Sequence, residues 1–309
     1  MYDIKFYTPE DVPPEILAYE SELLQLKPGR AGKLGALILR LESSPETGKT
    51  VIKDQFSKVP LFTQKALYLE ESLPSMAYVY LMSPSGGMLQ GDRYRIDLSL
   101  TKNACAHITT QGATRIYRME RNYATQVVTI FVDDGCYFEY IPDQIIPYRS
   151  SRFYQTAALK VHDNGTALYS EILAPGRVAS GESFEYDICY LKTQAKNQND
   201  HIRFADVLLL EPKKFDLETL GILGEKSVVG SLYIVTKQNY VKQLVDEIHV
   251  CLQKRPNILG GATALPHSSG VLVRMLGEVA DEIRNTIYQA VDITRRTILN
   301  ASFSGIRKY

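Results

Sequence analysis

Apolar and polar residues alternate along most of the chain between residues 34 and 227. The alternation is clearest at residues 94–100 and 184–190, while residues 126–132 and 167–173 are rich in β-branched and aromatic side chains. Such runs predict β-strands that are at least half buried. Turn signals separate the runs, at 85–87, 134–135, 164–165 and 175–176. Because no long helical pattern stands between the runs, this region predicts many short strands stacked in two sheets.

The hydrophobic pattern changes near residue 228 and then predicts a strand, a helix, two strands and a second helix. The strands are expected at 231–236, 262–265 and 271–276, and the second helix over 278–299. On the first helix, apolar side chains share one face at Val241, Leu244, Val245, Ile248 and Leu252. On the second, the inward side chains are expected to be Ile283, Ile287, Ala290, Val291 and Ile298. The outward ones are expected to be Glu282, Arg284, Arg295 and Arg296.

The predicted fold class is therefore mainly β, an elongated stacked two-sheet structure of many short strands with a small α+β C-terminal end. Three parts are expected. An N-terminal extension covers residues 1–31, a β-rich body covers 32–227, and a small α+β part packed on the body covers 228–309. Within the extension a short helix is expected after Pro13-Pro14, with apolar residues Ile16, Leu17, Leu23, Leu24 and Leu26.

Composition narrows the functional classes. Lys plus Arg and Asp plus Glu both number 35, so the formal charge is zero, which argues against a non-specific nucleic-acid binder. No apolar stretch approaches the about 18 residues of a membrane helix, and the N-terminus lacks the pattern of a secretory signal. The four cysteines stand alone, without a C-x-x-C pair. We therefore expect a cytoplasmic protein with reduced thiols, no nucleic-acid partner and no membrane partner.

Motifs for catalysis are weak or incomplete. Residues 43–50 (SSPETGKT) imitate the end of a phosphate-binding loop, but Ser43 replaces its first glycine and a strand-like run follows, so a hairpin turn is favoured. Cys105 and His107 share one strand face and could begin a metal site, although a buried thiol beside a hydrogen-bonded imidazole is the favoured interpretation. No nucleophile has a recognisable base motif, so we expect no enzymatic activity.

Three stretches carry more information. Residues 83–94 (SPSGGMLQGDRY) form a glycine-rich loop with a following Asp-Arg, and residues 109–118 read TTQGATRIYR. The third stretch has two parts, 139–148 (EYIPDQIIPY) and 171–184 (EILAPGRVASGESF). In this order and spacing they resemble the urease accessory protein D family (UreD, also called UreH). The similarity covers about residues 32–309, and the last five residues depart from the usual ending of the family.

The resemblance implies a mainly β protein that is not an enzyme. It implies a maturation factor that docks on apo-urease in a complex with accessory proteins F and G, the latter a GTPase. The assembly delivers nickel to the urease active site, and the D protein is thought to hold an internal tunnel for Ni²⁺. No permanently bound cofactor is implied, only transient Ni²⁺.

Sparse carboxylates suit such a path, because a conduit must bind a cation weakly enough to release it. The carboxylates of the motifs are Asp92, Glu139, Glu171 and Glu182. Structural roles are equally open for them, with Asp92 pairing with Arg93 or capping a turn and Glu182 accepting backbone N–H groups. The candidate partner-binding residues are Met88, Leu89, Tyr148 and Arg149.

Two other functional classes stay open at the level of sequence. An all-β hydrolase would use two of these carboxylates as a catalytic pair in an open groove. A plain interaction scaffold would dock on the same partners without any metal path.

Overall fold

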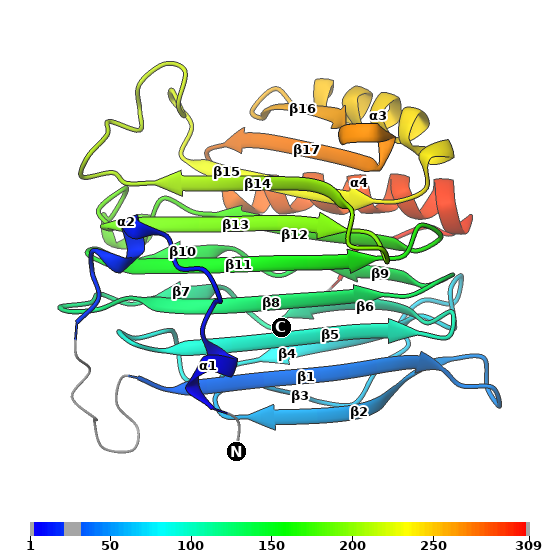
Figure 1. Cartoon of the computed structure of the whole chain (residues 1–309). Helices are drawn as coiled ribbons and strands as arrows, with labels where there is room; N and C mark the ends of the chain where they lie inside the picture. Colours follow the sequence, from blue (N-terminus) through cyan, green and yellow to red (C-terminus); the bar gives the residue numbers. More distant parts are fainter. Residues whose placement is uncertain (1–2, 22–31, 307–309) are drawn as a thin grey trace.

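The computed structural model describes residues 3–21 and 32–306, and within them the strands form two sheets that are stacked face to face (Figure 1). The seven-stranded sheet has the spatial order β14 (Ile202–Leu210), β13 (Ile188–Lys196), β11 (Arg152–Val161), β8 (Ala124–Val132), β5 (Arg93–Thr101), β1 (Leu34–Ser43) and β2 (Thr50–Lys58). The stacked two-sheet prediction is therefore confirmed.

The second sheet has ten strands. Its main path has the order β16 (Leu259–Ala264), β17 (Gly270–Gly277), β15 (Val228–Val235), β12 (Thr166–Leu173), β9 (Tyr137–Tyr140), β6 (Cys105–Thr110), β4 (Ala77–Met82) and β3 (Phe62–Thr63). Two short strands branch from it beside β12, namely β10 (Ile145–Pro147) and β7 (Thr114–Ile116).

Most of the body is a parallel coil. The chain passes back and forth between the sheets, so β5, β8, β11 and β13 are parallel neighbours in one sheet while β4, β6, β9 and β12 are parallel neighbours in the other. Antiparallel pairs occur towards the ends, including the β1–β2 hairpin. Its turn is closed by the Ser44 N–H, which donates to the Lys49 carbonyl at 2.8 Å, so the hairpin interpretation of residues 43–50 is confirmed.

Strand positions follow the sequence pattern with one exception. The strand expected at 184–190 begins only at Ile188, the start of β13. Phe184 instead has φ of +53° and donates its N–H to the carbonyl of Pro175 at 2.8 Å. The alternation at 184–187 therefore belongs to a turn that packs on the loop after β12.

The two largest apolar cores lie in separate layers, and a smaller cluster surrounds Ile16. One fills the space between the two sheets. The other lies between the outer face of the ten-stranded sheet and the helices α3 (Gln238–Gln253) and α4 (Ala280–Leu299). Because β15 pairs with β12, the α+β end extends the sheet of the body, and the proposed boundary at residue 228 stays a prediction.

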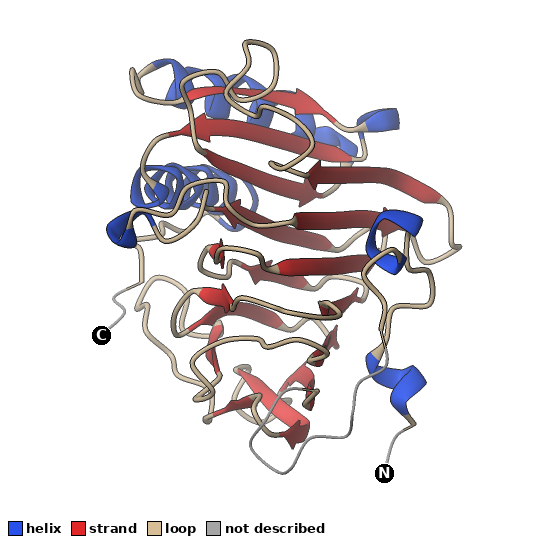
Figure 2. Cartoon of the chain, turned by 90° about the vertical axis from the view of Figure 1, so that its left-hand side faces the viewer, coloured by secondary structure: helices blue, strands red, loops and turns tan. Residues whose placement is uncertain are grey.

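The N-terminal segment lies on the opposite side, against the outer face of the seven-stranded sheet (Figures 1 and 2). Its helices are α1 (Ile4–Tyr7) and α2 (Pro14–Leu17), and short 3₁₀ turns occur elsewhere at η1 (Val178–Ser180) and η2 (Pro266–Ser268). Tyr7 and Ile16 are buried against the sheet. The helix predicted after Pro13-Pro14 is α2, whereas Leu23, Leu24 and Leu26, like Arg307–Tyr309, lie outside the described residues.

Gly230 sets the distance between β15 and α4. A Cβ atom at this position would fall inside van der Waals contact of Ile283 Cγ2 on the helix. We expect Gly230→Ala to lower the free energy of unfolding by about 1–3 kcal/mol, because overpacking forces the helix away from the sheet. Gly261→Ala is the matched control, since open space surrounds that glycine on β16. Equal denaturation midpoints for the two variants would contradict the close packing of α4.

Candidate functional site

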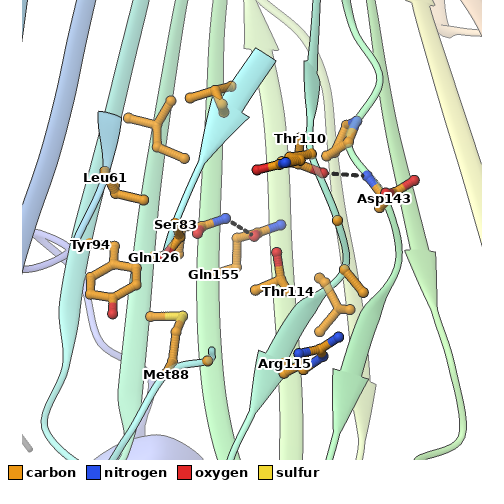
Figure 3. A pocket seen from close by; sticks show the side chains of 18 of the residues that line it. Leu61, Ser83, Met88, Tyr94, Thr110, Thr114, Arg115, Gln126, Asp143 and Gln155 are labelled. Carbon is orange, nitrogen blue, oxygen red and sulfur yellow. Dashed lines mark hydrogen bonds between the residues drawn. The ribbon is translucent and has the colours of Figure 1, made fainter. Parts of the chain in front are cut away.

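A cavity of about 360 Å³ lies between the two sheets, and we call it the inter-sheet cavity (Figure 3). Its walls come from β4, β5, β8 and β11, from β9 and β12, and from two loops. One loop contributes Ser83 and Gly86–Met88, and the other contributes Gln111–Ala113 between β6 and β7, so the first two sequence motifs form part of the lining. Near them the Asp143 N–H donates to Thr110 Oγ1 at 2.8 Å.

A row of polar side chains crosses the cavity although the surrounding core is apolar. Gln126 Nε2 donates to Gln155 Oε1 at 2.8 Å, as Figure 3 shows. Gln155 Nε2 in turn donates to Glu171 Oε1 at 3.0 Å. The same carboxylate oxygen accepts from Tyr169 OH at 2.8 Å and from Thr193 Oγ1 at 3.1 Å. Both sheets therefore contribute donors to Glu171.

The second oxygen of Glu171, Oε2, receives no hydrogen bond from the residues that the structure describes. Burial raises the pKa of Glu171 above its usual value, against the opposing effect of the three hydrogen bonds. Since the residue lines the cavity, this arrangement orients the carboxylate through one oxygen and leaves the other available to a water molecule or a cation.

Glu139 belongs to a different place, the core beneath α4. Its carboxylate is fully buried and accepts from Arg295 Nε at 2.7 Å and Arg295 Nη2 at 2.6 Å. His107 and Tyr137 OH also contact it, at 2.5 and 2.9 Å. Burial alone would raise the pKa of Glu139, but the charge and hydrogen bonds of Arg295 more than offset this and hold it at about 2.

Asp92 caps a turn. Its carboxylate accepts the backbone N–H groups of Lys33 and Leu89 at 2.8 and 2.9 Å, and Tyr94 OH at 3.2 Å. The guanidinium of Arg93 does not pair with this carboxylate. It donates instead to backbone carbonyls, including that of Tyr123, and to Asn122. Of the two structural roles considered, the turn cap is the one observed.

Glu182 pairs with Arg177 and accepts the Arg149 N–H at 3.3 Å. The hydrogen bond from Arg177 lowers the pKa of Glu182. Of the four motif carboxylates, only Glu171 lines the inter-sheet cavity. A catalytic pair drawn from these four is therefore not assembled in the cavity, and the nickel-path assignment of each residue stays a prediction.

The candidate partner-binding residues differ in how far they are exposed to solvent. Met88 is 1% exposed and belongs to the core between the sheets, so it offers no surface to a partner in this conformation. Leu89 and Tyr148 are half-buried, and the Tyr148 ring packs between Tyr117 and Arg177. Arg149 is exposed and pairs with Glu185. Partner binding by the last three stays a prediction.

Arg295 corrects the sequence analysis, which placed it outward on α4. It is fully buried, because its guanidinium neutralises Glu139 and also donates to Glu70 Oε2 at 2.8 Å. Its spacing already carried this signal, since it follows Ile287 and Val291 at steps of four on the buried face. Gln155 also escaped the sequence analysis. Its signal was a polar residue at an inward position, between Phe153 and Ala157 in β11.

The pair Cys105 and His107 does not begin a metal site. The His107 ring stacks against Tyr78 and Phe303 and contacts Glu139, so the hydrogen-bonded imidazole is confirmed. Burial raises the pKa of the Cys105 thiol. In residues 3–21 and 32–306, no group of three or more His, Cys, Asp or Glu side chains could hold a metal ion. In the same part of the chain, no helix is both long and apolar enough to cross a membrane.

A two-sheet coil of parallel strands with a cavity between its sheets defines a β-solenoid-like protein. Comparison with known families then identifies the group: the chain belongs to the UreD family of urease accessory proteins, whose model matches residues 34–307. Membership supports a role in urease maturation.

Similar proteins come from distant organisms. Urease accessory protein UreD of Cenarchaeum symbiosum is 42% identical over 284 residues, which cover 92% of this chain and 99% of the relative. Urease accessory protein UreD 2 of Brucella canis is 36% identical, covering 93% of this chain and 95% of its own. The UreD protein of Yersinia pseudotuberculosis is 33% identical, with 94% and 90% covered. All three are named as accessory proteins rather than as enzymes.

Proposed function

We propose that this protein is a non-catalytic urease maturation factor that carries Ni²⁺ through the inter-sheet cavity. In this proposal it acts in the cytoplasm, docked on apo-urease together with accessory proteins F and G, and the ion is its cargo rather than a resident cofactor. The observation that carries the proposal is Glu171, which lines the cavity and whose Oε1 accepts three hydrogen bonds, while no described residue donates to Oε2.

The chemistry of the wall suits a cation that must be bound and then released. Ni²⁺ accepts oxygen ligands, and a single carboxylate oxygen with water molecules binds it far more weakly than a cage of thiolates and imidazoles. A cavity of about 360 Å³ has room for the ion with several waters. The side-chain amides of Gln126 and Gln155 supply further polar contacts without adding charge. The lining of the cavity therefore combines two carboxylates, Glu171 and Asp143, and the guanidinium of Arg115 with these neutral polar groups.

Proton competition follows from the raised pKa of Glu171. Burial favours the protonated form of this carboxyl, so protons compete with a cation for it at higher pH than they do at an exposed glutamate. We expect Ni²⁺ binding to strengthen as the pH rises through the pKa of Glu171 and to weaken as the pH falls.

Glu171→Gln tests the proposal, because glutamine keeps the size of the side chain and removes the charge. We expect nickel transfer to apo-urease to fall about tenfold, as for the loss of one charged ligand, with the complex still assembled. Glu182→Gln is the matched control, since both glutamates are 6% exposed and only Glu171 lines the cavity. Normal transfer by Glu171→Gln, with nickel content and assembly measured on the same samples, would favour a scaffold without a metal path.

A further inference from the structure

Next to Glu171, towards the edge of both sheets, Asp206 of β14 and Arg274 of β17 form an ion pair. We propose that Asp206 is a second cation-binding position, which the guanidinium of Arg274 occupies until a divalent cation takes its place. The inference rests on the proposed function of the inter-sheet cavity and adds a gate to it.

Strand register places the carboxylates of Glu171 and Asp206 close to each other in one row of polar side chains. Glu171, Ser231 and Arg274 are successive register partners on β12, β15 and β17, so their side chains project to the same side. With neighbouring strands about 4.8 Å apart, the Cα atoms of Glu171 and Arg274 are roughly 10 Å apart. On the facing sheet Thr193 and Asp206 are register partners. Thr193 donates to Glu171, so the row passes between the sheets here.

The hydrogen bonds of Glu171 are partly repeated at Asp206. Tyr169 OH donates to Glu171, and Tyr233 OH donates to Asp206 Oδ2 at 2.6 Å. The two tyrosine rings are stacked, with centroids 6.1 Å apart. Arg274 also donates to Asp206 Oδ2, and none of the described residues donates to Oδ1. Each carboxylate thus accepts a hydrogen bond from a tyrosine through one oxygen, and the two tyrosines are register partners on β12 and β15.

The exposure of the ion pair is what allows it to open. The side chains of Arg274 and Asp206 are 33% and 24% exposed, because β14 ends the seven-stranded sheet while β17 and β16 continue the other. Because water reaches both side chains, the guanidinium can leave the carboxylate without stranding a fully buried charge. The pair of Arg295 with Glu139, by contrast, is fully buried and fixed.

The position of Arg274 gives it a defined effect on a cation. While it holds Asp206, Arg274 also donates to Ser231 Oγ at 2.9 Å, and its positive charge, two strands away from Glu171, repels an ion bound at that carboxylate. When it leaves, Asp206 becomes a free carboxylate one step further along the row. The expected ligand class is a hydrated divalent metal ion that accepts oxygen ligands.

Calorimetric titration of the full-length chain with Ni²⁺ tests the gate. Arg274→Gln is expected to bind Ni²⁺ about tenfold more tightly at one added position, because a repelling charge is removed and Asp206 is freed. The double variant Asp206→Asn with Arg274→Gln should lose this gain. Arg95→Gln is the control, since Arg95 and Asp97 form a pair of similar exposure, 24% and 21%, away from the cavity. Identical binding by Arg274→Gln and Arg95→Gln would overturn the proposal.

Glu171→Gln separates the gate from the cavity. Weakened binding in this variant, without any gain in Arg274→Gln, removes the gate and keeps the cavity. Unchanged binding in Glu171→Gln, with a gain in Arg274→Gln, keeps the Asp206 position and removes the cavity path. If Arg274→Gln does not fold, Ser231→Ala loosens Arg274 while keeping its charge, and binding is then expected to tighten about twofold to threefold. Wild-type binding by Ser231→Ala would count equally against the gate.

Discussion

Replacement of Arg295 by methionine is expected to lower the free energy of unfolding by about 3–5 kcal/mol at neutral pH, because it leaves a buried charge without its partner. Arg295 and Glu139 are both fully buried, and two hydrogen bonds of 2.6 and 2.7 Å join them. The guanidinium also donates to Glu70 at 2.8 Å and to Tyr78 OH at 2.9 Å. Methionine fills part of the space but satisfies none of these acceptors.

The loss of stability in Arg295→Met is expected to change with pH in a defined direction. In the native protein the pKa of Glu139 is about 2, below the ordinary value of 4.5, so its stabilisation is present above about pH 4.5 and is lost as the pH falls towards 2. Without Arg295, burial dominates and raises the pKa of Glu139 above its ordinary value. Its ionisation then opposes folding, so the deficit of the variant should shrink as the pH is lowered from 7 towards 4.

Denaturant unfolding of matched variants measures this effect. Arg296→Met is the control, since that side chain is 67% exposed on the same helix and its loss should change stability by less than about 0.5 kcal/mol. Adding Glu139→Gln to Arg295→Met should restore part of the loss, because no uncompensated charge then remains. If Arg295→Met and Arg296→Met unfolded alike, the buried pair would not be holding α4 on the sheet.

Replacement of Thr114 by tryptophan is expected to reduce nickel transfer to apo-urease more than about tenfold, because an apolar constriction excludes a hydrated cation. Thr114 is half-buried on β7 and its side chain lines the inter-sheet cavity (Figure 3). The indole can enter existing space, so we expect complex assembly and the unfolding midpoint to stay near those of the wild type.

Arg118→Trp is the control for this substitution. Arg118 is exposed a few residues further along the chain and does not line the cavity. Nickel transferred to apo-urease, complex formation and thermal unfolding should be measured on both variants. Transfer at the wild-type rate by a folded, assembled Thr114→Trp protein would show that the ion does not use the cavity.

The sequence predicts where the strands lie better than it predicts which strands pair and in which direction. Alternation located β5 closely, because a half-buried strand repeats every two residues whatever its neighbour is, and β-branched and aromatic content located β8 and β12. The same repeat occurs in parallel and antiparallel sheets, so the parallel coil was not predictable from it. The turn around Phe184 also escaped, since a left-handed residue leaves no trace in an alternating pattern.

The candidate site was also predicted only in part from the sequence. Glu171 stands in a motif and was predicted as a candidate, but its donors Gln155 and Thr193 come from strands that meet it only through the register of two stacked sheets. Arg295 was misplaced because a charged residue on a helix is usually exposed. Its spacing places it on the buried face of the helix, and Glu139, far away in sequence, supplies the opposite charge that it needs there.

Glu139 and Arg295 are 156 residues apart in the chain. During protein synthesis, parts of the fold must therefore form in a definite order. The parallel coils pair with their neighbours in the chain and can form as the chain emerges from the ribosome. The carboxylate of Glu139 and the ring of His107 must wait for the last helix before the guanidinium reaches them. Until then the outer face of the ten-stranded sheet, with Tyr78 and Tyr137, is uncovered. A nascent chain arrested before residue 280 therefore presents this face to chaperones and to other unfinished chains.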